Sequence, residues 1–263
     1  MPIKAEPTFS LKDRLFNEKK IKIIAGEIAA VHPAFEADRF TAKVAGKLPE
    51  LELMDRLHWI RECLHDFLPS DYRVAAKILK ESLPAPCDPK LTDKDFGDFI
   101  YGPYGAFVAE YGCTQKDVKF SLKILKEMTK RFSVEFPIRS FINTFPEETM
   151  AELLTWTKDK HYHVRRLASE GTRPSLPWAK NITIDYKAPL PILDILHADK
   201  TRFVTRSVAN HLNDISKVDP DLVVRTLKGW KKAKKQTKSE LDYLIRHSLR
   251  TLEKQGHTAA LKL

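Results

Sequence analysis

Residues 161–179 read HYHVRRLASEGTRPSLPWA, and the first half of this stretch decides the fold because its pattern returns twice. Arg166 in HYHVRRLA is followed 40 residues later by Arg206 in RFVTRSVA, and 40 residues after that by Arg246 in DYLIRHSL. Apolar residues in all three segments recur at helical spacing. Each segment is therefore predicted to be a helix that occurs once per repeating unit.

A second amphipathic segment precedes each of these helices. The three segments are PEETMAELLTW from Pro146, PLPILDIL from Pro189 and DPDLVVRTLKGW from Asp219. Pro146 and Pro220 fall where the first residue of a helix is expected, because that position needs no backbone N–H donor. Two helices in about 40 residues is the period of HEAT or armadillo repeats. Such units stack into a curved solenoid whose concave face is lined by the second helix of each unit.

The remainder of the chain fits the same all-α architecture. Further helices are expected at residues 10–31, 34–48, 51–68, 71–83 and 114–132. GPYG at 102–105 is interpreted as a bend, 84–93 as a loop, and ITIDY at 182–186 as a short extended piece. The sequence therefore predicts a single HEAT-like helical-repeat domain over residues 1–263, with its clearest repeats at 146–256.

The chain is basic, with 45 Lys and Arg against 35 Asp and Glu, a net charge of +10 and a pI near 9.4. This excess favours a polyanionic partner, nucleic acid before membrane, although a protein that is merely basic would show the same balance. The nine histidines lack metal-ligand spacing, and no Walker A, dinucleotide-binding, HExxH or GxSxG motif occurs. The sequence thus gives no support to a metal-dependent hydrolase, a kinase or a dehydrogenase.

Cysteine usage and the N-terminus favour a cytoplasmic location. Cys63, Cys87 and Cys113 are odd in number and lack CxxC spacing, which fits a reducing compartment. The first residues lack the apolar region of a secretory signal, and no run of about 18 apolar residues is present to span a bilayer.

The repeated arginines are candidate phosphate ligands, since a guanidinium is always charged and can bind a phosphate in a bidentate way. Their competing interpretation is structural, because arginines in helical repeats often pair with an acid of a neighbouring unit. Asp159, Asp199 and Asp242 are close enough in sequence to serve. The basic run KGWKKAKKQTK at 228–238 has the same two interpretations, a phosphate-contacting edge or a solvated helix end.

The second half of 161–179 contains two of the three candidate catalytic residues, Glu170 and Trp178, and Glu135 precedes it in the chain. Glu170 lies one turn after Arg166 and can simply pair with it within the helix, which is expected to stop at Gly171. The long loop that follows favours function, and its Trp178 either covers the core or offers a stacking face for a base or a cation. Glu135, in SVEFP, is either a helix-start acid or a partly desolvated carboxylate.

The segment HVRRLASEGTRPSLPWA resembles the signature of the AlkC branch of the AlkC/AlkD bacterial DNA alkylation-repair glycosylases. The resemblance is strongest at 161–179 and extends more loosely over most of the chain. It implies that Arg166, Glu170 and Trp178 are site residues. The family also places an acid in the preceding repeat, and Glu135 fits that role by order and context.

The resemblance implies a monofunctional DNA glycosylase that hydrolyses the N-glycosidic bond of alkylated, cationic bases such as 3-methyladenine in double-stranded DNA. The expected catalytic residues are Glu135, Glu170 and Trp178, whose carboxylates and ring would stabilise an oxocarbenium-like transition state. The expected DNA contacts are Arg165, Arg166, Arg173, Lys180, Arg206, Lys231 and Lys232. No metal or cofactor is expected, and the protein is expected to be a monomer. The alternative is a non-catalytic repeat module that binds nucleic acid or an acidic protein.

Overall fold

The computed structural model describes residues 10–90, 97–177 and 179–258, and the elements in these ranges are helices. The first half contains α1 (Leu11–Leu15), α2 (Glu18–Val31), α3 (Ala37–Lys47), η1 (Leu48–Glu50), α4 (Leu53–Phe67), α5 (Tyr72–Glu81), η2 (Phe99–Tyr101), α6 (Gly102–Tyr111) and α7 (Val118–Met128). The second half contains α8 (Glu135–Thr144), α9 (Pro146–Trp156), α10 (Tyr162–Glu170), α11 (Leu190–Leu196), α12 (Arg202–Ile215), α13 (Pro220–Ala233) and α14 (Lys238–Lys254). The described residues include no strand, only an isolated bridge between Gly97 and Phe132. The predicted all-α fold is confirmed.

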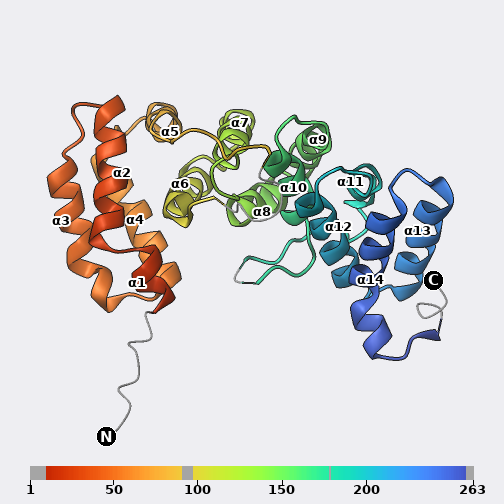
Figure 1. The fold of residues 1–263 in the computed structure, drawn as a ribbon. Helices are drawn as coiled ribbons and strands as arrows, with labels where there is room; N and C mark the ends of the chain where they lie inside the picture. The colour runs from red at the N-terminus through yellow and green to blue at the C-terminus, as the bar shows by residue number, and fades with distance from the viewer. Residues whose placement is uncertain (1–9, 91–96, 178, 259–263) are drawn as a thin grey trace, which may run out of the picture.

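The helices form two rows that bend into an arch (Figure 1). In the inner row α4 packs against α6, α6 against α8, α10 against α12, and α12 against α14. In the outer row α5, α7, α9 and α11 make successive contacts. The second helix of each predicted repeat therefore belongs to the inner row. Figure 1 shows the loop between α10 and α11 extending into the hollow of the arch.

Most predicted helices are present, and the prolines begin two of them as expected. Pro146 is the first residue of α9 and Pro220 the first of α13. Asp219 caps α13, because its side chain accepts a hydrogen bond from the backbone N–H of Leu222 at 2.9 Å. The expected extended piece at 182–186 forms no strand.

Two predictions about the first half were wrong. The helix expected over 10–31 is two helices, because Asn17 caps the second one by accepting from the N–H of Lys20 at 3.1 Å. Ser10, which precedes α1, makes no side-chain capping bond. The GPYG segment does not bend the chain: it opens α6, where Pro103 occupies a position that tolerates a missing N–H.

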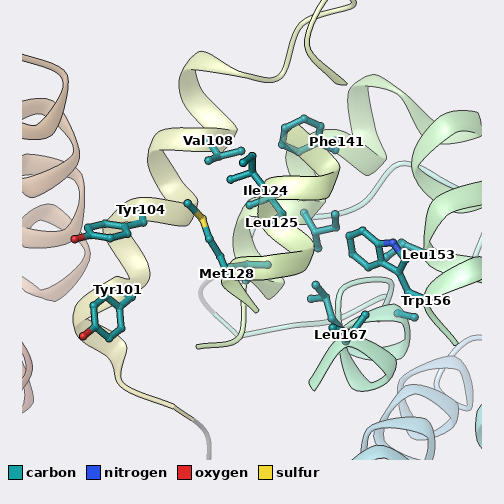
Figure 2. Close-up of a cluster of buried hydrophobic side chains, with 14 of the residues drawn as sticks. Tyr101, Tyr104, Val108, Ile124, Leu125, Met128, Phe141, Leu153, Trp156 and Leu167 are labelled. Carbon is teal, nitrogen blue, oxygen red and sulfur yellow. The ribbon is translucent and has the colours of Figure 1, made fainter. Parts of the chain in front are cut away.

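Buried apolar side chains form one contiguous cluster from Phe16 to Leu252. Figure 2 shows its central part, where side chains of α6, α7, α8, α9 and α10 meet. The labelled residues are Tyr101, Tyr104, Val108, Ile124, Leu125, Met128, Phe141, Leu153, Trp156 and Leu167. Trp156 is 1% exposed and Phe141 is fully buried. Removal of such large side chains from water is the main term that stabilises the stack of helices.

The contact between α10 and α12 includes a fully buried histidine, and it predicts a pH-dependent stability. His211 Nδ1 lies 3.1 Å from the carbonyl oxygen of Ser169. Burial, reinforced by the Arg173 guanidinium, lowers the pKa of His211 to about 3. The ring is therefore neutral in the folded state at pH values where an unfolded chain, with a histidine pKa of about 6.5, binds a proton.

We expect His211 to make the fold less stable as the pH falls from about 6.5 toward 3, by about 1.4 kcal/mol per pH unit inside this window. Denaturant unfolding between pH 4 and pH 7 measures this slope. His211→Gln should have a shallower slope than the wild type, whatever its stability at pH 7. An identical slope in the two proteins would show that His211 does not titrate in this way.

Candidate active site

The two candidate glutamates lie on either side of one guanidinium. Arg166 of α10 donates from Nη1 to Glu135 Oε2 at 2.8 Å, and its Nη2 lies 3.5 Å from Glu170 Oε1. The guanidinium also lies over the ring of Phe203, with its central carbon 4.5 Å from the ring centroid. Arg166 thus joins the first turn of α8 to the last turn of its own helix. The structure brings together three of the residues expected at the site.

Glu170 is the more enclosed of the two acids. Its side chain is 5% exposed, and Arg173 Nη1 donates to its Oε1 at 2.6 Å. Burial alone would raise the pKa of Glu170, but the Arg166 and Arg173 guanidiniums and the Ser207 hydroxyl lower it by more than burial raises it. The pKa of Glu170 therefore lies below the usual glutamate value. Glu170 is a buried, ionised carboxylate whose negative charge is stabilised by two arginines.

Glu135 is held less tightly and is more open. It is the first residue of α8, and its side chain is 20% exposed. Its Oε2 accepts bonds from Ser133 at 2.7 Å and from Arg166, whereas its Oε1 accepts no hydrogen bond from the described residues. Both sequence interpretations of Glu135 therefore hold together: it starts a helix and is partly desolvated. Its free oxygen can accept a proton or a hydrogen bond from a ligand.

A cavity of about 260 Å³ lies between α4, α6, the start of α8 and the loop after α10, and the neighbours of Glu135 in sequence line it, although Glu135 itself does not. Its wall includes Ser133, which donates to Glu135. Other residues of the wall are His58, Arg61, Phe132, Phe136 and Lys180. Burial and the neighbouring Arg61 lower the pKa of His58, so this ring is neutral at pH 7. The cavity thus combines apolar walls with a few polar groups, as ligand sites commonly do.

The loop after α10 is fastened to α8 by a residue that the sequence analysis did not single out. Arg139 is fully buried, and it donates to the carbonyl oxygens of Gly171 at 3.2 Å, of Arg173 at 2.8 Å and of Lys180. The sequence feature that could have identified Arg139 is its place on an apolar helical face, because its neighbours Ile138, Phe141 and Ile142 are also buried. One buried cation therefore ties both ends of segment 171–180 to the helix that begins with Glu135.

Asn143 extends this attachment further along the loop. Its Nδ2 donates to the carbonyl oxygen of Asn181 at 2.8 Å, and its Oδ1 accepts from the N–H of Thr183 at 3.0 Å. Trp178 lies outside the described residues, so its predicted role stays a prediction. The loop segments on both sides of Trp178 are nonetheless held against α8.

Gly171 is required by close packing rather than by its backbone angles. The helix ends at Glu170 as expected, but the φ of Gly171 is −63°, within the range of ordinary helical residues. A Cβ atom at this position would lie 2.6 Å from Cγ2 of Ile138 and 3.0 Å from the carbonyl oxygen of Leu167. Glycine therefore lets the end of α10 approach α8, which helps to place Glu170 near Glu135.

The expected DNA contacts differ in how free their charged groups are. Arg165, the neighbour of the repeat arginine Arg166, is paired with Asp199, Nε to Oδ2 at 2.5 Å. Arg173 is shared between Glu170 and Asp214, the latter at 2.9 Å. Both guanidiniums are therefore already engaged within the protein.

Other candidate contacts lie at least partly at the surface. Arg206 of α12 is half-buried and makes no hydrogen bond or ion pair with the described residues. Lys180 is exposed at the rim of the cavity beside Glu135. Lys231 and Lys232 are exposed on α13, and Arg246 is exposed on α14. Arg206 is thus the repeat arginine of the inner row whose charge is least satisfied by the fold.

The described residues contain no group of three or more His, Cys, Asp or Glu side chains that could hold a metal ion. Among the helices of the described ranges, none is long and apolar enough to cross a membrane.

Comparison with known proteins identifies the class. A model of the DNA alkylation repair enzyme family matches residues 110–247, just over half of the chain. The matched region contains the Glu135, Arg166 and Glu170 cluster together with the inner helices from α8 to α12. The chain therefore belongs to the DNA alkylation repair enzyme family.

Two relatives place the chain within that family. It is 36% identical to an alkylpurine DNA glycosylase, AlkC of Pseudomonas fluorescens, solved bound to DNA containing an abasic site analogue. The TM-score is 0.83, over 98% of this chain and 68% of that one. The chain is also 35% identical over 253 residues to the uncharacterized protein YhaZ of Bacillus subtilis (strain 168), covering 95% of this chain and 66% of YhaZ. It thus spans about two thirds of the length of either relative, and the resemblance to the AlkC branch is confirmed.

Proposed function

We propose that this protein is a monofunctional DNA glycosylase that releases alkylated, cationic bases such as 3-methyladenine from duplex DNA. The observation that carries the proposal is the geometry of Glu135, a partly desolvated carboxylate that shares Arg166 with Glu170 and has one oxygen unbonded by the described residues. Membership of the family and similarity to a DNA-bound alkylpurine glycosylase support the substrate class. We further propose that the protein acts as a monomer in the cytoplasm, without a metal or an organic cofactor.

The reaction needs electrostatic stabilisation more than acid catalysis. Alkylation of a ring nitrogen gives the base a positive charge, so the base is already a good leaving group. As the C1′–N bond breaks, its electron pair goes to the ring nitrogen and neutralises the base. Positive charge then builds on the deoxyribose, as in glycoside hydrolysis. A fixed carboxylate near C1′ lowers the energy of this oxocarbenium-like state.

Glu135 is suited to this role because its carboxylate is incompletely neutralised. Its Oε2 is held by Ser133 and Arg166, which fixes the direction of its Oε1. That oxygen can face the sugar and accept a proton from the attacking water. The water oxygen then bonds to C1′, and the proton passes from Glu135 to solvent.

Glu170 supports the same site from inside the protein. Its charge is shared by Arg166 and Arg173, and 5% of its side chain is exposed. Its role in the proposal is to hold the Arg166 guanidinium in place and to make the electrostatic potential at the site more negative. Trp178, on the loop tied down by Arg139, would face the cationic sugar or base through its ring.

The site uses the hollow of the arch to approach DNA. Arg206 and Lys180 offer cations that the described residues leave unpaired, and both belong to the inner row or to the loop in the hollow (Figure 1). Guanidinium and ammonium groups attract the phosphates of any duplex, independent of sequence. Arg165, Arg166 and Arg173 are omitted from the proposed contacts because their guanidiniums are paired internally.

The proposal is tested by release of free base from DNA treated with a methylating agent. We expect the protein to liberate 3-methyladenine, detected by chromatography, and to leave abasic sites without strand cleavage. Enzyme-independent loss from the same DNA, incubated without protein, gives the background. DNA binding with no base release above this background would favour the alternative, a non-catalytic nucleic-acid-binding module.

A further inference from the structure

Three turns of the repeat region lie in a row along one edge of the arch. They join α9 to α10 at 157–161, α11 to α12 at 197–201, and α13 to α14 at 234–237. Arg165, near the start of α10, reaches from the first turn to Asp199 in the second. Gln236 in the third turn donates to the carbonyl oxygens of His197 at 3.2 Å and of Asp199 at 2.8 Å. The turns are therefore linked one to the next.

Acidic residues in these turns are neutralised within the protein. Asp159 accepts from Lys126 at 2.8 Å and from the backbone N–H of His161 at 2.8 Å, and its pKa is lowered although burial alone would raise it. Asp199 is 6% exposed and paired with Arg165. Asp159 is thus paired with Lys126 and Asp199 with Arg165, and neither is paired with a lysine of these turns.

Lysines of the same turns are exposed and unpaired. None of their ammonium groups makes a hydrogen bond or ion pair with the described residues. We call this set the lysine edge: Lys158, Lys160, Lys200, Lys234, Lys235 and Lys238. At the α9–α10 end a crevice of about 640 Å³ hollows the surface, lined by the unpaired Lys158 and Lys160, by Asp159, and by Lys126 and Lys130, which pair with Asp159 and Glu127. The positive charge is thus concentrated on the outside of the turns.

The opposite edge of the repeats has a different charge. Glu147 and Glu148 lie in the first turn of α9, and Asp221 lies in the first turn of α13 after the capping Asp219. These acids are typical of helix N-termini, where negative side chains are favourable. Lys187 and Lys217 are also exposed at this edge, so its charges are mixed, whereas the lysine edge presents cations.

We propose that the lysine edge binds the phosphates of the duplex that flanks the lesion, outside the hollow that contains Glu135. Packed helices are roughly 8–10 Å apart, so the three turns span roughly 16–20 Å. That length corresponds to about five or six base pairs, at 3.4 Å per pair. Lysine ammoniums on flexible stems act as point charges, which suits backbone contacts that carry no sequence information. This inference rests on the proposed function, which places the lesion at Glu135 in the hollow.

Duplex length provides the test. The variant Lys160→Gln, Lys200→Gln, Lys235→Gln removes one charge from each turn and leaves the Glu135 cluster untouched. Binding is measured by fluorescence anisotropy at several salt concentrations, with duplexes of about 10 and about 30 base pairs centred on an abasic-site analogue. For the long duplex we expect about a 10- to 100-fold weaker affinity and a salt slope smaller by about 2 to 3. For the short duplex the affinity should stay within about twofold of the wild type.

A control variant separates position from net charge. Lys116→Gln, Lys119→Gln, Lys123→Gln removes the same charge from exposed lysines at and before the start of α7 in the outer row. It should bind both duplexes like the wild type. Equal losses in the two triple variants, or no loss in the lysine-edge variant, would overturn the proposal.

A second comparison keeps this inference distinct from the proposed function. Undamaged duplexes of the same two lengths should show the same length-dependent loss, since phosphate contacts do not depend on the lesion. If the wild type released no methylated base, the proposed glycosylase activity would be wrong. The effect of duplex length on binding would still decide whether the lysine edge contacts DNA. Loss of base release by the lysine-edge variant on the short duplex would instead show that these lysines act at the site, against the proposal.

Discussion

Replacing Glu135 by Gln is expected to lower the single-turnover rate of 3-methyladenine release by about 10²–10³-fold. The amide keeps the shape of the side chain and an oxygen that can accept from Ser133 and Arg166. It removes the negative charge that the developing positive charge on the deoxyribose requires, and it cannot accept the proton of the attacking water. DNA affinity should change little, since Glu135 contacts no group proposed to bind phosphate.

Rates measured with enzyme in excess over methylated DNA report the chemical step directly. Glu110→Gln is the matched control, because Glu110 lines the neighbouring cavity and pairs with Arg61 at 3.0 Å rather than with Arg166. This control should retain nearly the wild-type rate. A wild-type rate for Glu135→Gln would mean that the carboxylate nearest the reacting sugar is another one.

The repeat architecture could be predicted because its signals are local. The spacing of 40 residues between Arg166, Arg206 and Arg246 reflects one inner helix per unit, and Pro146 and Pro220 fix where outer helices begin. The prediction for 10–31 failed because apolar spacing continues through Asn17. A capping side chain there competes with the helix, and periodicity alone does not register this competition.

Only part of the site was accessible to the same reasoning. The proximity of Arg166 and Glu170 follows from helical spacing, but the contact between Arg166 and Glu135 spans 31 residues and depends on how α8 meets α10. Arg139 was missed because a cation on an apolar helix face has no local partner in sequence. Its acceptors are backbone carbonyls up to 41 residues away.

The arginine row shows why residue type alone does not define a DNA contact. Arg166 and Arg206 occupy equivalent positions, 40 residues apart in successive inner helices. Arg166 is paired with Glu135 and Glu170, whereas Arg206 has no acid within bonding distance among the described residues. Which arginine is paired depends on the acids of its own and the neighbouring inner helix, a feature of the stacked structure. Lys231 and Lys232, predicted from a basic run, lie on the outer helix α13 and remain predictions.

Replacing Glu170 by Gln is expected to lower the free energy of unfolding by about 3–5 kcal/mol, in addition to abolishing most base release. Glu170 is 5% exposed and neutralises Arg166 and Arg173, so the amide would leave two largely buried guanidiniums without their shared carboxylate. Arg166 would then hold Glu135 less rigidly, which links the loss of stability to the loss of rate. Urea unfolding at pH 7 and single-turnover kinetics measure the two effects.

The pH dependence of this loss distinguishes a charged Glu170 from a merely well-packed one. Its folded pKa is lowered, so its contribution is fully present above the unfolded value of about 4.3 and is lost as the pH falls through the folded pKa. The difference in stability between wild type and Glu170→Gln should therefore be largest near pH 7 and shrink in acid. Glu240→Gln is the control: it breaks the more exposed pair with Arg202 in the next unit and should leave base release intact. A stability difference that is the same at pH 7 and in strong acid would show that Glu170 stabilises the fold without its charge, and the electrostatic role assigned to it would fail.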